Sequence, residues 1–119
     1  MRGKYKLSAS LLNLFVFLIT CIYNMKALII SSDTLDKLLK KHRVTRREVE
    51  QCFDNLCGTY LEDEREDHKS DPPTLWFIAP TNEDRILKII FIFIDGNLHL
   101  RSAFPPNKDE IDLYERVGK

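Results

Sequence analysis

The 119-residue sequence has few cysteines, no internal repeat and no low-complexity stretch, and its 18 basic and 18 acidic residues cancel. Three cysteines (Cys21, Cys52 and Cys57) do not provide the disulfide framework of a small secreted protein. The balanced charge argues against a uniformly basic nucleic-acid binder, although it leaves room for a basic face. A phosphate-binding glycine loop and the Ser–His–Asp and Cys–His signatures are also missing. The 44% apolar content suits one domain with a modest core.

The first 24 residues differ in composition from the rest of the chain. They contain Arg2, Lys4 and Lys6 but no acid, followed by an apolar stretch over residues 11–23 without an A-x-A cleavage site. We interpret residues 1–24 as upstream sequence and Met25 as the start of a single cytoplasmic domain, 25–119. The alternatives are a signal peptide or a marginal membrane anchor, which would make the protein exported or membrane-anchored. If neither alternative applies, no association with a membrane is expected.

Charge is unevenly distributed along the domain. Because three of the 18 basic residues precede residue 25, residues 25–119 hold 15 basic against 18 acidic groups, a net charge of −3. Residues 26–47 hold seven basic and two acidic residues, whereas residues 48–71 hold two basic and nine acidic ones. The run "LEDEREDHKSDPP", residues 61–73, combines eight charged residues with a histidine. It is typical of a solvated loop, but it also contains groups suited to acid–base chemistry.

Helical spacing predominates in the first half of the domain. Residues 26–30 predict a short edge strand, and Ser32 is expected to cap a helix that ends near His42. Its apolar stripe is formed by Leu35, Leu38 and Leu39. "TRRE", residues 45–48, is a capping box that begins a second helix, which Gly58 ends. This helix is expected to turn four residues inward: Val49, Cys52, Phe53 and Leu56.

Strand spacing follows in the second half. Residues 59–62 are interpreted as the start of one strand, and "TLWFIAP" (74–80) and "RILKIIFIFID" (85–95) as a hairpin. "DG" at 95–96 predicts a tight turn into "NLHLRSAF". Residues 86–94 are apolar on both faces apart from Lys88, which indicates a central strand covered on both sides. "PPNKDEIDLYERV" ends the chain with a helix. The sequence therefore predicts an α+β domain: two N-terminal helices packed on an antiparallel β-meander, with a short C-terminal helix.

Cations and a histidine are predicted to gather on one face of this meander. A two-residue turn would pair Ile92 with His99 and Ile90 with Arg101, which places Lys88, His99 and Arg101 on the same side. These residues are either solvent-facing or a phosphate-binding cluster. In the second case the charged run would bring three more groups beside them: Arg65, His68 and Lys69.

An ordered series of motifs resembles the BrnT-type toxin family. The series consists of "KHRVTRREVEQCF", "YLEDEREDH", a tryptophan-bearing strand, "RILKIIFIFIDGNLHLRSA" and "P-x-x-x-E-x-x-x-Y", spread over about residues 35–116. That family is similar to RelE-like ribonucleases, which pack two helices on an antiparallel sheet, cleave RNA and are silenced by a co-encoded DNA-binding antitoxin. The resemblance implies the toxin of a type II toxin–antitoxin system, with an RNA substrate, a small DNA-binding antitoxin as partner, and neither cofactor nor metal.

The candidate site residues follow from the resemblance and from the needs of the reaction. RNA cleavage without a metal ion requires a proton acceptor, cations for the phosphorane and a proton donor. The candidate catalytic residues are Glu64 or His68 as base, Arg65, Lys88 and Arg101 as cations, and His99 or His42 as acid. The candidate substrate-binding residues are His42, Lys69, Arg85 and Ser102.

Two other functions remain open at this point. A non-catalytic partner-binding domain would suit the net charge of −3, and also Phe104, which stands where members of the resembling family often have arginine. The stretch "EDEREDH…DPPTLWFI" is also similar to short proteins labelled ADP-ribosyl-(dinitrogen reductase) hydrolase. Enzymes with that activity use a much larger all-helical domain with a two-metal carboxylate site, an architecture that this short, strand-rich chain does not predict.

Overall fold

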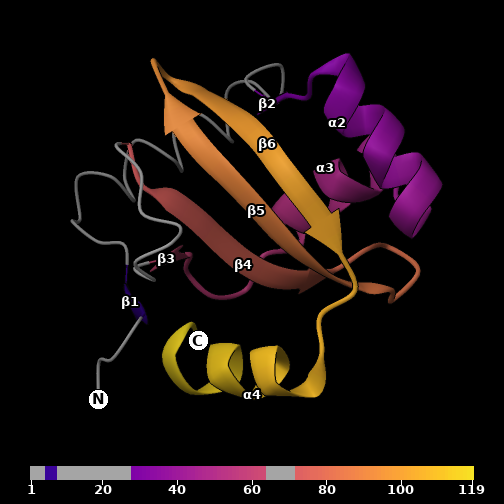
Figure 1. Cartoon of the computed structure of the whole chain (residues 1–119). Coiled ribbons are helices and arrows are strands. Elements are labelled where there is room, and N and C mark those ends of the chain that lie inside the picture. Colours follow the sequence, from indigo (N-terminus) through magenta and orange to yellow (C-terminus); the bar gives the residue numbers. More distant parts are fainter. Residues whose placement is uncertain (1–4, 8–27, 64–71) are drawn as a thin grey trace.

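A computed structural model describes residues 5–7, 28–63 and 72–119 as a mixed sheet with helices on both faces (Figure 1). The six strands lie in the order β1-β3-β4-β5-β6-β2. They are β1 (Tyr5–Leu7), β2 (Leu28–Ile29), β3 (Leu61–Asp63), β4 (Thr74–Pro80), β5 (Ile86–Ile94) and β6 (Asn97–Phe104). The helical elements are α2 (Ser32–Lys37), the π-helical η2 (Leu38–His42), α3 (Arg46–Asp54) and α4 (Lys108–Val117). The predicted α+β class is confirmed.

Strands β3 to β6 form the predicted antiparallel meander. The turn between β5 and β6 has positive φ at both central residues, 52° at Asp95 and 81° at Gly96, as a two-residue hairpin with right-handed twist requires. β2 lies at the sheet edge and runs parallel to β6, which confirms the short edge strand. β1 pairs antiparallel with β3 at the other end of the strand order.

The predicted pairing of Ile90 with Arg101 is wrong. Ile92 does stand opposite His99, but Ile90 pairs with Ser102, because the register shifts between Ile90 and Phe91. Arg101 is therefore the extra residue of a β-bulge, and its side chain is exposed. Counting residues in steps of two cannot detect one inserted residue. The face shared by Lys88 and His99 therefore does not extend to Arg101 by simple alternation.

α3 and its apolar side chains cover one face of the sheet. The predicted capping box is present, since Thr45 and Glu48 each bond the other's backbone, and α3 buries Val49, Cys52 and Phe53 as expected. The Phe53 ring lies 4.9 Å from that of Phe77 and 5.4 Å from that of Phe91. Such edge-to-face contacts add to the burial of apolar area.

The end of α3 differs from the prediction. The helix ends at Asp54, before Gly58 is reached. Gly58 has a different role, because a Cβ added there would collide with the Gly118 carbonyl oxygen and the Tyr114 hydroxyl. The absence of a side chain at residue 58 therefore allows the end of α4 to approach this loop.

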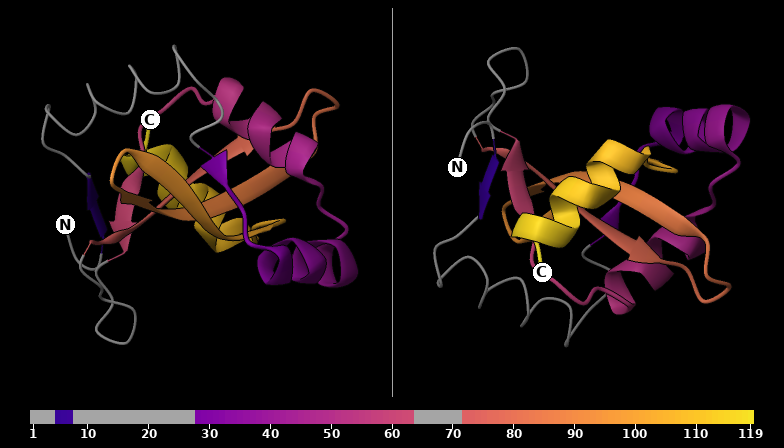
Figure 2. Two further views of the ribbon diagram at one scale, coloured as in Figure 1. Left: turned by 90° about the horizontal axis from the view of Figure 1, so that it is seen from above. Right: turned by 90° about the horizontal axis from the view of Figure 1, so that it is seen from below.

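α4 covers the opposite face of the sheet and crosses in front of the strands in the view from below (Figure 2). The Trp76 and Tyr114 rings lie 5.8 Å apart, and the Tyr114 hydroxyl donates a hydrogen bond to the Thr59 carbonyl. A second capping box, between Asn107 and Glu110, begins the helix. β5 is thus a central strand covered on both faces, as its sequence predicted.

The first helix differs from its prediction in two details. Its cap is Ser31 rather than Ser32, and the Ser31 hydroxyl accepts from the Thr34 backbone N–H. Leu38 is buried, but Leu39 is 45% exposed, so its place on the buried stripe was wrong. The helix changes to π-helical bonding at Leu38, so a stripe counted with the α-helical period no longer applies beyond that residue.

In the described part of the chain, no helix is long and apolar enough to cross a membrane. The apolar stretch over residues 11–23 lies outside the described residues, so neither the interpretation of Met25 as the start nor its alternatives are tested.

Candidate functional site

The C-terminal end of η2 has an unusual residue at its cap. Arg43 adopts the left-handed conformation, with φ 54° and ψ 43°. Its backbone N–H donates to the Leu39 carbonyl at 3.2 Å, and the Val44 N–H donates to the Leu38 carbonyl at 3.1 Å. Both Leu38 and Val44 are buried. The bond from Arg43 to Leu39 is that of the αL cap, in which the left-handed residue at the helix end is usually glycine.

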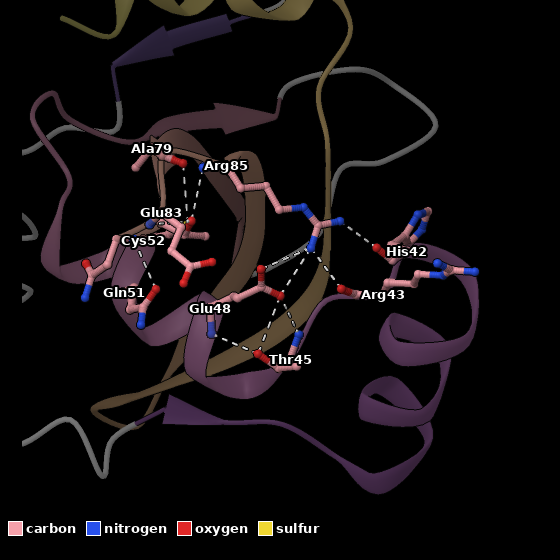
Figure 3. A network of polar contacts seen from close by, with 11 residues as sticks. His42, Arg43, Thr45, Glu48, Gln51, Cys52, Ala79, Glu83 and Arg85 are labelled. Atoms are coloured by element: carbon pink, nitrogen blue, oxygen red, sulfur yellow. Dashed lines mark hydrogen bonds and ion pairs between the residues drawn. The ribbon is translucent and has the colours of Figure 1, made fainter.

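The Arg85 guanidinium completes this helix end (Figure 3). Nη2 donates to the His42 carbonyl at 2.7 Å, and Nη1 donates to the Arg43 carbonyl at 2.8 Å. Nη1 also contacts both Glu48 carboxylate oxygens, at 3.1 and 3.2 Å. Glu48 accepts from the Thr45 N–H at 3.0 Å as part of the capping box. One side chain, from the residue before β5, therefore binds the carbonyls at the end of η2 and connects them to the first turn of α3.

Cations are concentrated around this helix end. Between residues 37 and 47 the sequence contains six Lys or Arg residues, one histidine and no acid. Two of them pair with acids, Lys40 with Asp36 and Arg46 with Glu50. The other four are exposed, and no acid among the described residues forms an ion pair with them. We call these four the basic segment: Lys37, Lys41, Arg43 and Arg47.

The His42 side chain lies beside the end of β6. Its ring is half-buried, with the centroid 5.5 Å from that of Phe104. The Phe104 ring also lies near the Lys88 ammonium, which is 5.9 Å from the ring centroid. The imidazole of the predicted site is therefore held against an aromatic ring next to the basic segment.

Lys88 is buried and has its own carboxylate partner. Its Nζ donates to Glu110 Oε2 at 2.7 Å and lies 4.5 Å from the centroid of the Trp76 ring. The Lys88 side chain is only 8% exposed. A cation over an indole face and against a carboxylate is stabilised by both groups. Lys88 thus attaches the first turn of α4 to the sheet, and its charge is already neutralised.

The structure brings together three of the residues selected from the sequence. His42 and Arg85 are joined by a hydrogen bond, and both His42 and Lys88 lie against Phe104. His99 and Ser102 are half-buried on β6, opposite Ile92 and Ile90. Arg101 lies in the bulge. The remaining candidates lie outside the described residues: Glu64, Arg65, His68 and Lys69.

The sequence also contained signals for groups that were not selected. Glu48 and Glu110 are each the third helical residue of a capping box, and each uses a second contact of its carboxylate to hold a cation, Arg85 or Lys88. Glu110 is the glutamate of the "P-x-x-x-E-x-x-x-Y" block. The capping role was readable from spacing, whereas the long-range cation partner depends on how the chain folds.

The two described cysteines, Cys52 and Cys57, do not form a disulfide. Cys52 is buried, and its Sγ donates to the Ala79 carbonyl at 3.4 Å. Burial raises the pKa of the Cys52 thiol to about 12, so it remains protonated and unreactive at neutral pH. Cys57 is exposed. Within the described ranges, no three His, Cys, Asp or Glu side chains are grouped so as to hold a metal ion.

Neither a protein-family model nor a curated protein matches this chain.

Proposed function

We propose that this domain binds RNA through the basic segment and cleaves it without a metal ion, as the toxin of a type II toxin–antitoxin pair with a RelE- or BrnT-like fold. The observation that supports this most directly is the set of exposed, uncompensated cations beside the half-buried imidazole of His42. RNA presents one phosphate per nucleotide, and most sequence-independent affinity for it comes from such cations.

Two ion pairs, one just before β5 and one within it, determine which cations are available to bind phosphate. Arg85 and Lys88 were selected from the sequence as phosphate contacts, but they are held by Glu48 and Glu110. Releasing either cation would leave its carboxylate without its partner. Phosphate binding is therefore assigned to the basic segment, whose charges have no such competitor among the described residues.

The reaction that fits this arrangement is cleavage by the neighbouring 2′-hydroxyl. The 2′-oxygen forms a bond to phosphorus, the bond to the 5′-oxygen breaks, and the products are a 2′,3′-cyclic phosphate and a free 5′-hydroxyl. We assign His42 to donate the proton that the leaving 5′-oxygen takes up. The acceptor of the 2′-hydroxyl proton remains a prediction from sequence, Glu64 or His68, outside the described residues.

Cleavage of a labelled single-stranded RNA tests the proposal. The wild type should produce fragments with cyclic phosphate ends in the presence of EDTA, and an RNA with a 2′-deoxy nucleotide at the cut should bind but remain intact. His42→Ala should lose about a hundredfold in rate while retaining the fold and RNA binding. Arg116→Gln, which removes an exposed charge from α4, is the matched control and should behave as wild type. Binding without cleavage by the wild type would instead indicate a non-catalytic RNA-binding module.

A growth experiment tests the partner. Expression of the domain should arrest growth, and co-expression of a small basic DNA-binding protein encoded beside it should restore growth. Release of ADP-ribose from a modified protein, with no effect on RNA, would support the hydrolase alternative and contradict the toxin proposal.

A further inference from the structure

We propose that Arg43 is a phosphate-contacting residue of the RNA site and that Arg85 is the positioning residue that directs it. This inference rests on the proposed function and names two roles within it. Among the described residues, three other than glycine have positive φ: Arg43, Asp84 and Asp95. Aspartate tolerates the left-handed conformation, and both aspartates lie in loops between strands. Arginine at such a position requires another explanation.

The fold uses only the backbone of Arg43. Its N–H bonds the Leu39 carbonyl, and its own carbonyl accepts from Arg85. The side chain is exposed, and its guanidinium has no hydrogen bond or ion pair with another described residue. Glycine would therefore serve the helix end better, because it has no steric penalty in this conformation. A side chain kept where glycine fits better indicates that the side chain is needed for something other than folding.

Arg85 fixes the direction in which this side chain points. Its two terminal nitrogens hold the carbonyls of His42 and Arg43, which belong to the peptide groups on either side of the Arg43 Cα. With both flanking peptides held, the direction of the Cα–Cβ bond is set. Glu48 in turn holds Arg85 from the first turn of α3. The geometry thus directs Arg43 outward, next to His42, which is the group assigned to protonate the leaving oxygen.

The ligand group that this arrangement suits is a phosphodiester of single-stranded RNA. A guanidinium offers paired N–H donors that match two phosphate oxygens, and it stays charged at every physiological pH. Arg43 directly follows His42 in the sequence. Arg43 can therefore bind the phosphate of the RNA backbone while His42 reaches the 5′-oxygen that leaves this phosphate.

Replacing Arg43 by glycine separates folding from binding. Arg43→Gly should leave the melting temperature unchanged or raise it by about 4 °C, because glycine suits the left-handed cap. The same variant should bind labelled single-stranded RNA about tenfold more weakly. The slope of log affinity against log salt should become shallower by about 0.7, the value for one phosphate charge that is no longer neutralised. Arg116→Gln removes the same charge elsewhere and should change neither the affinity nor the slope.

Two further variants test the positioning role. Arg85→Lys keeps the charge but removes the forked pair of donors, so RNA cleavage should fall at least tenfold through kcat while Arg43 is still present. Asn55→Ala removes a different link between α3 and the β4–β5 loop, where Asn55 bonds the Pro80 carbonyl and Asn82. Asn55→Ala should lower the melting temperature about as much as Arg85→Lys does, but it should not reduce kcat.

The outcomes separate this inference from the function on which it rests. If Arg43→Gly binds RNA with wild-type affinity and salt slope, Arg43 is not a phosphate contact, although the RNA proposal stands through the other three cations. If Arg85→Lys and Asn55→Ala lose equal activity, Arg85 is only structural. A wild-type protein that fails to bind RNA at low salt overturns both the proposed function and the inference.

Discussion

The two faces of the sheet are closed by different chemistry. On the α3 face, the rings of Phe53, Phe77 and Phe91 meet edge to face, and α3 adds the neutral thiol of Cys52. On the α4 face, the Lys88 ammonium lies between the Trp76 ring and the Glu110 carboxylate. Both faces bury apolar area, and the α4 face adds an ion pair that lies next to an aromatic ring.

This difference determines how each face responds to mutation. An apolar face loses transfer energy and gains a cavity when a side chain is truncated. A buried ion pair repays the desolvation of two charges only while both partners are present, so the loss of one partner is the costly event. The α3 face should therefore respond to changes in volume, and the α4 face to changes in charge.

The largest effect is expected from Phe91→Ala. Phe91 is fully buried, and its ring lies 5.4 Å from that of Phe53, 5.9 Å from that of Tyr60 and 6.2 Å from that of Phe77. The truncation should lower the free energy of unfolding by about 3–5 kcal/mol, measured by urea denaturation. Phe91→Leu, which leaves a smaller cavity, should cost clearly less. Equal losses in the two variants would show that cavity volume does not govern this face.

A smaller effect is expected from Lys88→Met, which preserves much of the volume but removes the charge. The Glu110 side chain is 27% exposed and still accepts from the Asn107 N–H, so the carboxylate charge is partly solvated after Lys88 is replaced. The expected loss is about 2 kcal/mol, below the value for a fully buried pair. Adding Glu110→Gln should recover part of this loss, because glutamine can still cap α4. If the double variant loses the sum of the two single losses, the ion pair contributes no coupling energy.

The sequence predicted the architecture because the features that determine it are local. The Thr45–Glu48 capping box, the Asp95–Gly96 turn and the continuous apolar run of β5 each act over a few positions, and these three features formed where the sequence indicated. The errors arose where one residue changes the geometry. The bulge at Arg101 and the change to π-helical bonding before Leu39 are local departures from a regular period, and counting with a fixed period does not detect them.

The candidate site was predicted less well because it depends on long-range partners. The family resemblance selected Arg85, and strand spacing selected Lys88, as cations near the site, and both do lie at one end of the sheet. Neither could show that Glu48 and Glu110 hold them, since these partners are 37 and 22 residues away in the sequence. Nor did spacing reveal Arg43, whose left-handed conformation becomes apparent only when the helix end is seen in three dimensions.

The smallest expected effect is a change in the free energy of unfolding with pH. It arises because each face of the sheet buries a weakly acidic group, the Cys52 thiol on the α3 face and the Tyr114 phenol on the α4 face. Burial raises the pKa of Cys52 from 9.0 to about 12, and burial also raises the pKa of Tyr114 above its ordinary value of 10.0. A raised pKa means that the unfolded chain releases its proton first, so stability is full below pH 9 and falls as the pH rises above it. Between pH 8 and 10 the Cys52 thiol should lower the free energy of unfolding by about 1.4 kcal/mol.

Cys52→Ala isolates this contribution, because the exposed Cys57 and the phenol of Tyr114 remain in both proteins. Guanidinium unfolding of the two proteins at pH 8 and pH 10 should show wild type losing about 1.4 kcal/mol more than the variant over that interval. An equal loss in both would mean that Cys52 ionises as readily in the folded chain as in the unfolded one. The α3 face would then admit water to the thiol, and its contrast with the charged α4 face would be weaker than the packing indicates.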